Sequence, residues 1–466
     1  MKRNHLFIKI VAAILLVIIV LFITARLVNK APSKELSASL QTKAIIDDGG
    51  CLACNNDPPK FPWYAKLPVV KNMLASDAAN ALKQINLSEA YTTLATNSPM
   101  GQVALNKIEN AVTHQTMPPA RFSVMHWKSK ITKAKRESLL SWAKGHRLTF
   151  YNNGLAAEEF RNEPVQPIQD SIPVDVRKVI LGEMLFHDVR LSLDNTLSCA
   201  SCHDLTTAGM DNEIVSDGVG GAVGQINSPT VYNSVYNFVQ FWDGRANTLA
   251  EQAAGPPLNP IEMASKSFDQ IIEKLRQDKA FTKAFLEVYP EMSESTITDA
   301  IGEFEKTLLT PNSRFDKYLK GDLTALSAQE ISGYELFKSH ECATCHSGVT
   351  LGGQSYEYLG LAQDYFAERG TDITEEDGGR FKQTGKQYDM HRFKVPGLRN
   401  IALTEPYFHD GTQKSLEDAV SAMLKYQLGV SVPDNEIGDI VAFLKTLTGE
   451  YKGIPLTNGT TSSTRK

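Results

Sequence analysis

The sequence has few cysteines, and none is left over for a structural disulfide. Six cysteines occur in 466 residues, and all six lie in three Cys-x-x-Cys pairs. Basic residues are not in excess either, because the formal net charge is −5. Such a charge balance gives no basic footprint, so we expect no nucleic-acid partner. Beyond the first 25 residues the composition is ordinary for a soluble protein, and the length is enough for two or three domains.

Two of the three cysteine pairs are followed directly by histidine. The chain reads Cys-Ala-Ser-Cys-His at 199–203 and Cys-Ala-Thr-Cys-His at 342–346. This pattern is the attachment signature of c-type haem, in which the thiols bond the vinyl groups and the imidazole ligates the iron. A Cys₄ zinc site or a redox dithiol has no use for a histidine after each pair, so we favour haem. The residues concerned are Cys199, Cys202, His203, Cys342, Cys345 and His346.

The N-terminus carries an apolar run over residues 10–25, flanked by basic residues on both sides. A cleaved signal peptide is the alternative, because the run is short for a membrane span. No good small-x-small cleavage site follows it, and the span can extend back to Leu6 with Lys9 reaching the membrane surface. We therefore predict a single uncleaved anchor, with its basic N-terminal end in the cytoplasm and the rest of the chain outside.

The third cysteine pair, Cys51 and Cys54, is followed by Asn55 instead of histidine. These residues alone leave haem, a dithiol and a small metal site open. The surrounding stretch also contains Pro-Trp-Tyr at 62–64, Met-Pro-Pro at 117–119 and a later histidine. Over about residues 45–146 it resembles a family of small haem-binding domains. The resemblance implies a third haem, with Met117 and His126 as the first ligand candidates and His114 and Asn55 behind them.

The rest of the chain carries several further motifs. They are Asn-Ser-Pro-Thr at 227–230, Phe-Trp-Asp-Gly-Arg-Ala at 241–246, Glu-Gln-Ala-x-Gly-Pro at 251–256, Asn-Pro-x-Glu-Met at 259–263 and Tyr-Phe-His-Asp-Gly at 407–411. With the two complete haem motifs, this region closely resembles the bacterial dihaem cytochrome c peroxidase family. The additional N-terminal domain and anchor make the whole chain similar to the three-haem, membrane-bound members that take electrons from quinol.

Apolar periodicity indicates helices throughout, without convincing strand alternation. We predict an all-α fold: an N-terminal transmembrane helix followed by three cytochrome c-like helical haem domains. The expected divisions are an anchor at 1–30, a linker at 31–48, an N-terminal haem-binding domain at 49–150, a peroxidatic haem domain at 165–325, an electron-transfer haem domain at 326–455 and a polar tail at 456–466.

The resemblance implies roles for the iron ligands. His203 belongs to the peroxidatic haem, where hydrogen peroxide binds, and His346 belongs to the electron-transfer haem. The distal methionine of the second haem falls on Met423. A thioether paired with an imidazole raises the haem potential, which suits electron transfer.

The resemblance also implies catalytic residues. The acid–base carboxylate falls on Glu262 and its helper amide on Gln252, whereas the neighbouring Glu251 is outside the matching position. Trp242 matches the aromatic residue between the two haems, and we assign it to electron transfer.

A calcium ion is implied at Asn227, Thr404 and Pro406, through one side chain and two backbone carbonyls. Many family members also place a histidine sixteen residues after the peroxidatic proximal histidine, where it blocks the iron in the oxidised enzyme. Here that position is Val219, within Gly-Val-Gly-Gly. Valine has no lone pair for iron, so we expect this haem to be open without prior reduction.

Together these features predict a peroxidase that reduces hydrogen peroxide with electrons from membrane quinol. A soluble cytochrome c is the alternative donor. We place it at the bacterial inner membrane with its catalytic domains in the periplasm. The rivals are a dihaem enzyme that oxidises a partner protein and a tethered electron carrier or sensor. Met423 argues against the first rival, whose second haem usually has a tyrosine ligand. Glu262 and Gln252 argue against the second.

Three cysteine pairs with none left over predict three covalently bound haems per chain. The intact mass of the denatured protein should therefore exceed that of the polypeptide by three haems. Cys51→Ala should remove one haem only. A mass corresponding to two haems in the unmodified protein would contradict the N-terminal assignment.

Overall fold

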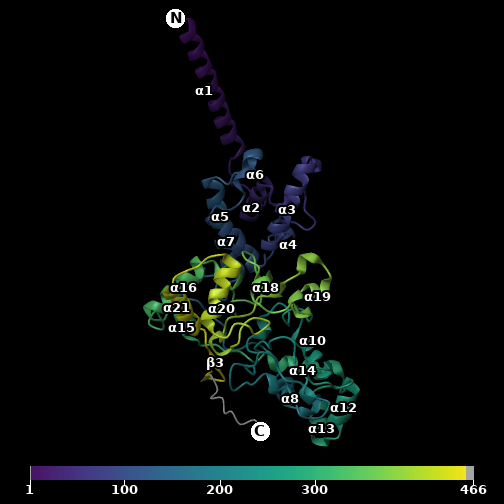
Figure 1. Cartoon of the computed structure of the whole chain (residues 1–466). Coiled ribbons are helices and arrows are strands. Elements are labelled where there is room, and N and C mark those ends of the chain that lie inside the picture. The colour runs from purple at the N-terminus through teal and green to yellow at the C-terminus, as the bar shows by residue number, and fades with distance from the viewer. Residues whose placement is uncertain (1, 458–466) are drawn as a thin grey trace. The chain divides into compact units, whose positions relative to one another are not determined.

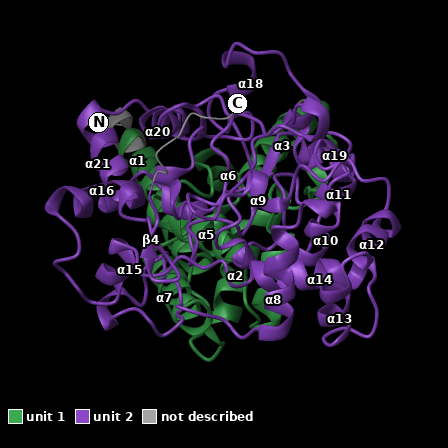
Figure 2. Cartoon of the chain, turned by 90° about the horizontal axis from the view of Figure 1, so that it is seen from below, with its two compact units in different colours: residues 1–151 green, residues 152–466 purple. Residues whose placement is uncertain are grey.

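The computed structural model describes residues 2–457 and divides the chain into two compact units, residues 1–151 and 152–466 (Figure 2). The predicted all-α character is confirmed, because helices dominate and the described strands are two to three residues long. The predicted polar tail at 456–466 lies outside the described residues from position 458 onward.

Unit 1 begins with a long apolar helix, α1 (Figure 1). Its segment Phe7–Val28 has a mean hydropathy of 3.1, and none of it is buried within the protein. This length and composition suffice to cross a membrane, and a signal sequence meets the same criterion. The helices of the unit are α1 (Lys2–Val28), α2 (Ala38–Gly49), α3 (Pro68–Gln84), α4 (Ser88–Thr96), α5 (Gln102–Thr113), α6 (Ala120–Met125) and α7 (Lys133–Phe150).

The segment predicted as a polar tether, 31–48, contains α2. The helix begins at a Ser37 cap, whose side chain accepts a hydrogen bond from the Leu40 N–H. Ile45 and Ile46 are buried, the latter against the core formed by α4, α5 and α7. These two isoleucines are adjacent in a polar stretch, so the sequence shows no extended periodicity, yet tertiary packing holds the helix.

Unit 2 contains two hydrophobic cores. The first packs α8 against α14, and the second packs α16 against α21. Each helix pair crosses at a glycine: a Cβ on Gly182 would lie 1.9 Å from the Ala300 carbonyl, and one on Gly333 would lie 1.9 Å from the Asp439 carbonyl. We call the part of unit 2 around the first core the first half and the part around the second core the second half. Each half is therefore organised around two helices that approach closely at a glycine.

The helices of the first half begin with α8 (Val176–Phe186), where the apolar face of the sequence predicts one. They continue with α9 (Cys199–Cys202), α10 (Leu249–Ala253), α11 (Gly255–Leu258), α12 (Phe268–Arg276), α13 (Lys279–Leu286) and α14 (Glu294–Glu305).

The second half begins with α15 (Arg314–Leu319) and α16, the latter opened by the capping box of Ser327 and Glu330 that the sequence predicts. The later helices are α16 (Ala328–Ser339), α17 (Cys342–Cys345), α18 (Tyr365–Glu368), α19 (Phe381–Thr384), α20 (Leu416–Met423) and α21 (Asp434–Lys445). Two antiparallel pairs complete it: β1 (Tyr356–Tyr358) with β2 (Arg392–Lys394), and β3 (Glu450–Tyr451) with β4 (Ile454–Pro455).

A buried ion pair fixes the second half. Arg399 donates to both carboxylate oxygens of Asp316, at 2.9 and 2.8 Å, and both side chains are almost fully buried. Asp316 also accepts the Ile168 N–H at 3.2 Å, so the pair ties the segment preceding α8 to α15.

Asp316→Asn should lower the free energy of unfolding by about 3–5 kcal/mol, because it leaves the Arg399 charge buried without a partner. Lys317→Met is the matched control, since Lys317 faces Glu450 at 3.6 Å near the surface. The control should cost below about 1 kcal/mol. Guanidinium midpoints of the haem-loaded protein, followed by circular dichroism, provide the measurement. Equal midpoints for the two variants would show that the buried pair contributes no more than a surface pair.

Candidate functional site

Each complete Cys-x-x-Cys-His motif forms a single helical turn. In α9 the His203 N–H donates to the Cys199 carbonyl at 3.0 Å, and in α17 the His346 N–H donates to the Cys342 carbonyl at 2.9 Å. The turn places the two thiols of a pair close together and the histidine directly after them. None of the six cysteines forms a disulfide, and all six are partly buried.

The histidine side chains are oriented for a ligand at Nε2. His203 Nδ1 lies 3.2 Å from the Gly209 carbonyl, and His346 Nδ1 lies 3.0 Å from the Leu351 carbonyl. A carbonyl oxygen only accepts, so Nδ1 carries the proton and the Nε2 lone pair is left for iron. Burial lowers the pKa of both imidazoles, which keeps them neutral.

Two buried titratable groups of unit 2 have shifted pKa values. Burial raises the pKa of the Cys342 thiol to about 12, as expected for a thiol in an apolar site. Lys394, in β2, is 5% exposed, and burial lowers its pKa to about 8. Within residues 2–457, no side-chain carboxylate lies within 4.0 Å of its ammonium group. A buried cation without a counter-ion suits an anionic group of a cofactor, such as a haem propionate.

Glu262 is a half-buried carboxylate held by its neighbours. Burial raises its pKa, while a hydrogen bond from Asn259 Nδ2 to Oε1, at 2.6 Å, and the charge of Arg245 act in the opposite direction. Arg245 is itself positioned by Asp243, at 3.1 Å, and by stacking over the Phe241 ring. A carboxyl group whose pKa is raised by burial is suited to take up and release a proton.

Gln252 lies half-buried on α10, whereas the adjacent Glu251 is exposed. Glu251 accepts hydrogen bonds from the backbone and side chain of Asn247, at 2.7 and 3.0 Å. The carboxylate of Glu251 is therefore occupied in capping a turn at the surface, which separates it from the proton chemistry assigned to Glu262.

The loop that carries Val219 lies directly on the backbone of Glu262. The Val219 N–H donates to the Glu262 carbonyl at 2.8 Å. A Cβ on Gly218 would lie 2.2 Å from the Ile261 carbonyl, so only glycine allows this approach. The resemblance places a blocking histidine in this loop in many family members, where this chain has Val219. The structure brings the loop against Glu262, whose acid–base role stays a prediction.

Trp242 is joined to both halves of unit 2 through Asn227. The Trp242 Nε1–H donates to the Asn227 carbonyl at 2.9 Å, and the Asn227 N–H donates to the His409 carbonyl at 2.8 Å. The Asn227 side-chain amide donates to the Glu213 and Ile214 carbonyls, at 3.0 and 3.3 Å. Asn227 therefore connects Trp242, the loop after His203 and the His409 turn.

The oxygens predicted to hold calcium are free of protein hydrogen bonds. Asn212 Nδ2 donates to the carbonyls of Leu403 and Glu405, both at 2.9 Å. In the described part of the chain, no hydrogen bond reaches the Thr404 or Pro406 carbonyl or the Asn227 side-chain oxygen. Such neutral oxygens suit a hard cation that keeps several waters.

Met423 is the last residue of α20, and a π-helical turn over Leu424–Leu428 follows it. Met423, Trp242 and Phe408 pack against one cluster of buried aromatic and aliphatic side chains. The thioether and the indole therefore share an apolar environment. The assignment of Met423 as an iron ligand stays a prediction.

The N-terminal cysteine pair is arranged differently from the other two. Cys51 begins a 3-10 turn, Cys51–Ala53, and burial raises the pKa of its thiol to about 11. Asn55 is buried, and its amide donates to the carbonyls of Ala81 and Ile85, both at 3.2 Å. Asn55 therefore caps the end of α3 where a motif histidine would otherwise stand.

The two candidate ligands of this unit lie on either side of α6. Met117 is half-buried in the preceding loop. His126 stacks on Phe122 with ring centroids 3.9 Å apart, and its Nε2 and Nδ1 contact the Tyr64 hydroxyl, at 2.5 Å, and the Phe122 carbonyl, at 2.9 Å. Both nitrogens of His126 are thus engaged in this arrangement. Ligation by either residue stays a prediction.

No sequence motif marks the buried carboxyl groups of Glu305 and Asp377. Glu305, on α14, is 5% exposed, has no hydrogen-bond partner for Oε2, and its pKa is raised to about 8 by burial. Its charge also contributes to the raised pKa of Cys199, which places it near the haem motif. No motif marks Glu305, and only its position at the end of an amphipathic helix hinted at burial.

Asp377 lies beside His409 and Asp410 of the Tyr-Phe-His-Asp-Gly motif, and the ligand atoms of the three residues are close enough to hold a metal. Arg369 already pairs with both carboxylates, at 2.5 and 2.9 Å. Although burial acts to raise it, hydrogen bonds from His409 and Arg369 hold the pKa of Asp377 well below its usual range. We therefore interpret this cluster as a buried ion-pair network that fixes the His409 turn.

Comparison with known families and proteins gives two family matches. Residues 176–324 match the family described as di-haem cytochrome c peroxidase, and residues 13–145 match a haem-binding domain. The chain is 49% identical to the cytochrome c peroxidase Ccp of Escherichia coli K12 over 421 residues, which covers 90% of both chains. It is 45% identical to the cytochrome c551 peroxidase of Nitrosomonas europaea, over 68% of this chain and 92% of that protein.

Among solved structures, a MauG-like protein associated with microbial copper homeostasis aligns with a TM-score of 0.53 and 31% identity. The alignment covers 62% of this chain and 93% of that one. The dihaem peroxidase BthA of Burkholderia thailandensis aligns with a TM-score of 0.51 at 22% identity, which supports the fold alone.

The hydrogen bond from Asn259 predicts a pH effect. Asn259→Ala removes a bond that favours ionised Glu262, so the pKa of Glu262 should rise further. Because the base must be ionised, the acid limb of the kcat/KM profile for peroxide should move to higher pH. Asn247→Ala is the matched control, since it bonds Glu251 instead. If the acid limb does not move in Asn259→Ala, the ionisation of Glu262 does not set that limb and the prediction is wrong.

The Val219 loop predicts a spectral signature. The fully oxidised protein should contain one high-spin haem, because no side chain at 219 blocks the iron. Val219→His should convert this haem to low spin and make peroxide reactivity dependent on prior one-electron reduction. The electronic absorption and electron paramagnetic resonance spectra measure both states. Haems that are all low-spin in the unmodified oxidised protein would contradict the prediction.

Proposed function

The chain belongs to the di-haem cytochrome c peroxidase family, and on that premise we propose that it reduces hydrogen peroxide to water with electrons from membrane quinol. The observation that carries the proposal is the half-buried Glu262 beneath the Val219 loop, in the same half as the His203 motif. An electron carrier or a sensor needs no such acid–base group.

Three sites would hold haem covalently: Cys199 and Cys202 with His203 as ligand, Cys342 and Cys345 with His346 and Met423, and Cys51 and Cys54 with Met117 or His126 as ligand candidates. Haem at these sites supplies an iron that binds peroxide and centres that store electrons. We propose that electrons pass from the haem site of the N-terminal unit to the His346 site, and then past Trp242 to the His203 site.

The protein's own residues handle the protons. Ionised Glu262 takes a proton from the bound peroxide oxygen and returns it to the oxygen that leaves as water. Asn259 orients the carboxylate through its 2.6 Å hydrogen bond. Gln252, on α10, is proposed to hold the peroxide by hydrogen bonding. Arg245 keeps a positive charge near Glu262, which favours the ionised form at rest.

A calcium ion is proposed at Asn227, Thr404 and Pro406. The three oxygens that accept no hydrogen bond support it, and so does the link from Asn227 to Trp242. Calcium at this place would fix the position of the indole between the two halves.

Quinol as donor is supported by the apolar helix Phe7–Val28, which is long enough to anchor the chain in the bacterial inner membrane. The haem-bearing units then lie in the periplasm, and the soluble alternative donor is cytochrome c.

Full-length protein in detergent should oxidise decylubiquinol in a peroxide-dependent reaction, with one quinone formed per peroxide. Turnover with reduced cytochrome c and none with decylubiquinol would overturn the assignment of the donor.

Glu262→Gln should lower turnover by about 10²–10⁴-fold, because an amide cannot carry the proton between the two oxygens. All haems should remain attached, as checked by mass and absorption. Glu251→Gln is the matched control and should keep the activity of the unmodified protein. Activity near that level in Glu262→Gln would rule out its catalytic role.

A further inference from the structure

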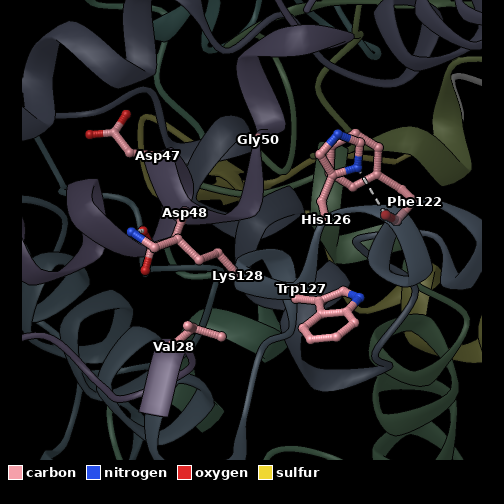
Figure 3. A pocket seen from close by; sticks show the side chains of 8 residues that line it. All are labelled: Val28, Asp47, Asp48, Gly50, Phe122, His126, Trp127 and Lys128. Atoms are coloured by element: carbon pink, nitrogen blue, oxygen red, sulfur yellow. Dashed lines mark hydrogen bonds and ion pairs between the residues drawn. The ribbon is translucent and has the colours of Figure 1, made fainter. Parts of the chain in front are cut away.

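A cavity of about 610 Å³ lies in unit 1 at the end of the apolar helix α1 (Figure 3). Val28, the last residue of α1, forms part of its wall. Its other lining residues are Asp47, Asp48, Gly50, Phe122, His126, Trp127 and Lys128. Because the predominantly apolar segment Phe7–Val28, 22 residues long, ends at the cavity, an inserted helix would bring the cavity to the membrane surface.

The end of α1 is fixed to this cavity. Asn29 is buried, and its amide donates to the Ala25 carbonyl at 2.9 Å and to the Trp127 carbonyl at 2.6 Å. Its side-chain oxygen is buried without a hydrogen-bond partner. Two apolar side chains of the same segment are exposed, Val124 by 73% and Trp127 by 46%. Exposed tryptophan beside a membrane helix is typical of the membrane interface.

The walls of the cavity differ in chemistry. On one side Trp127 and the stacked rings of Phe122 and His126 form an aromatic wall, and on the other side lie Asp47, Asp48 and Lys128 (Figure 3). Asp48 is held by the buried Lys135, at 3.1 Å, so its carboxylate has a fixed position. The cavity therefore offers a flat apolar face and hydrogen-bond acceptors opposite it.

The aromatic wall reaches the cysteine pair. Gly50, which precedes Cys51, lies so close to Phe122 that a Cβ there would be 2.8 Å from the ring. Phe122 in turn stacks on His126 at 3.9 Å. A molecule in the cavity is thus separated from the Cys51 attachment point by one residue of backbone and one ring.

We propose that this cavity is the site where membrane hydroquinone binds and is oxidised. The proposal rests on the proposed function and locates its donor site. Oxidation breaks the two O–H bonds of the hydroquinone and yields a quinone, two electrons and two protons. The protons leave by way of Asp48 and Asp47, whose side chains are 29% and 43% exposed. The two electrons pass through the proposed haem sites to the His203 site. There one hydrogen peroxide takes up two electrons and two protons to form two waters.

The test uses the full-length, haem-loaded protein in detergent, with decylubiquinol as substrate and decylubiquinone as the bound probe. Trp127→Leu should weaken decylubiquinone binding in equilibrium dialysis, and raise the apparent KM for decylubiquinol, by about tenfold. Asp48→Asn should lower kcat by about 10²-fold. Haem content and haem midpoint potentials should stay unchanged in both variants.

Two matched controls lie in the same unit and do not line the cavity. Trp63→Leu removes a tryptophan that is 81% exposed, and Asp77→Asn removes a carboxylate paired with Arg121. Both should keep the binding and kinetic constants of the unmodified protein.

The possible outcomes distinguish the location of the quinol-binding site from the identity of the electron donor. Failure of the unmodified protein to oxidise decylubiquinol would overturn the donor itself. If it oxidises decylubiquinol and both cavity variants match their controls, the donor stands and the site lies elsewhere. Loss of one haem in Trp127→Leu would show that the cavity belongs to the N-terminal haem, which also overturns the proposal.

Discussion

The hydrogen bonds of Asn227 hold the functional part of unit 2 together. Its backbone accepts from Trp242 and donates to the His409 turn, and its side chain binds the loop that follows His203. This one asparagine, 4% exposed, therefore links Trp242, the loop that follows His203 and the His409 turn. Trp242 also packs with Met423 against one cluster of buried side chains.

The attachment motifs and much of the fold followed from sequence because they are local. A Cys-x-x-Cys-His stretch forms one turn whatever surrounds it, and α8, α16 and α20 are marked by apolar faces or capping residues. Glu262, Trp242 and Asn227 were found only by resemblance to a family. Their spacing alone does not distinguish a catalytic carboxylate from an exposed loop residue.

The remaining features depend on contacts between distant segments. Nothing near Lys394 or Glu305 in the sequence reveals that each is buried without a counter-charge. The helix α2 was predicted as a tether because its two buried isoleucines are supported by tertiary packing instead of periodicity. The cavity beside Val28 likewise brings together residues about 100 positions apart in the sequence.

We predict that electrons cross between the two halves of unit 2 at Trp242. The direct measurement mixes fully reduced protein with peroxide and follows the oxidation of the haem held by His346, in the unmodified protein and in Trp242→Leu. Oxidation of that haem should be slower in the variant, while peroxide still reacts at the His203 haem at its normal rate. Oxidation of the His346 haem at the same rate in both proteins would contradict the account.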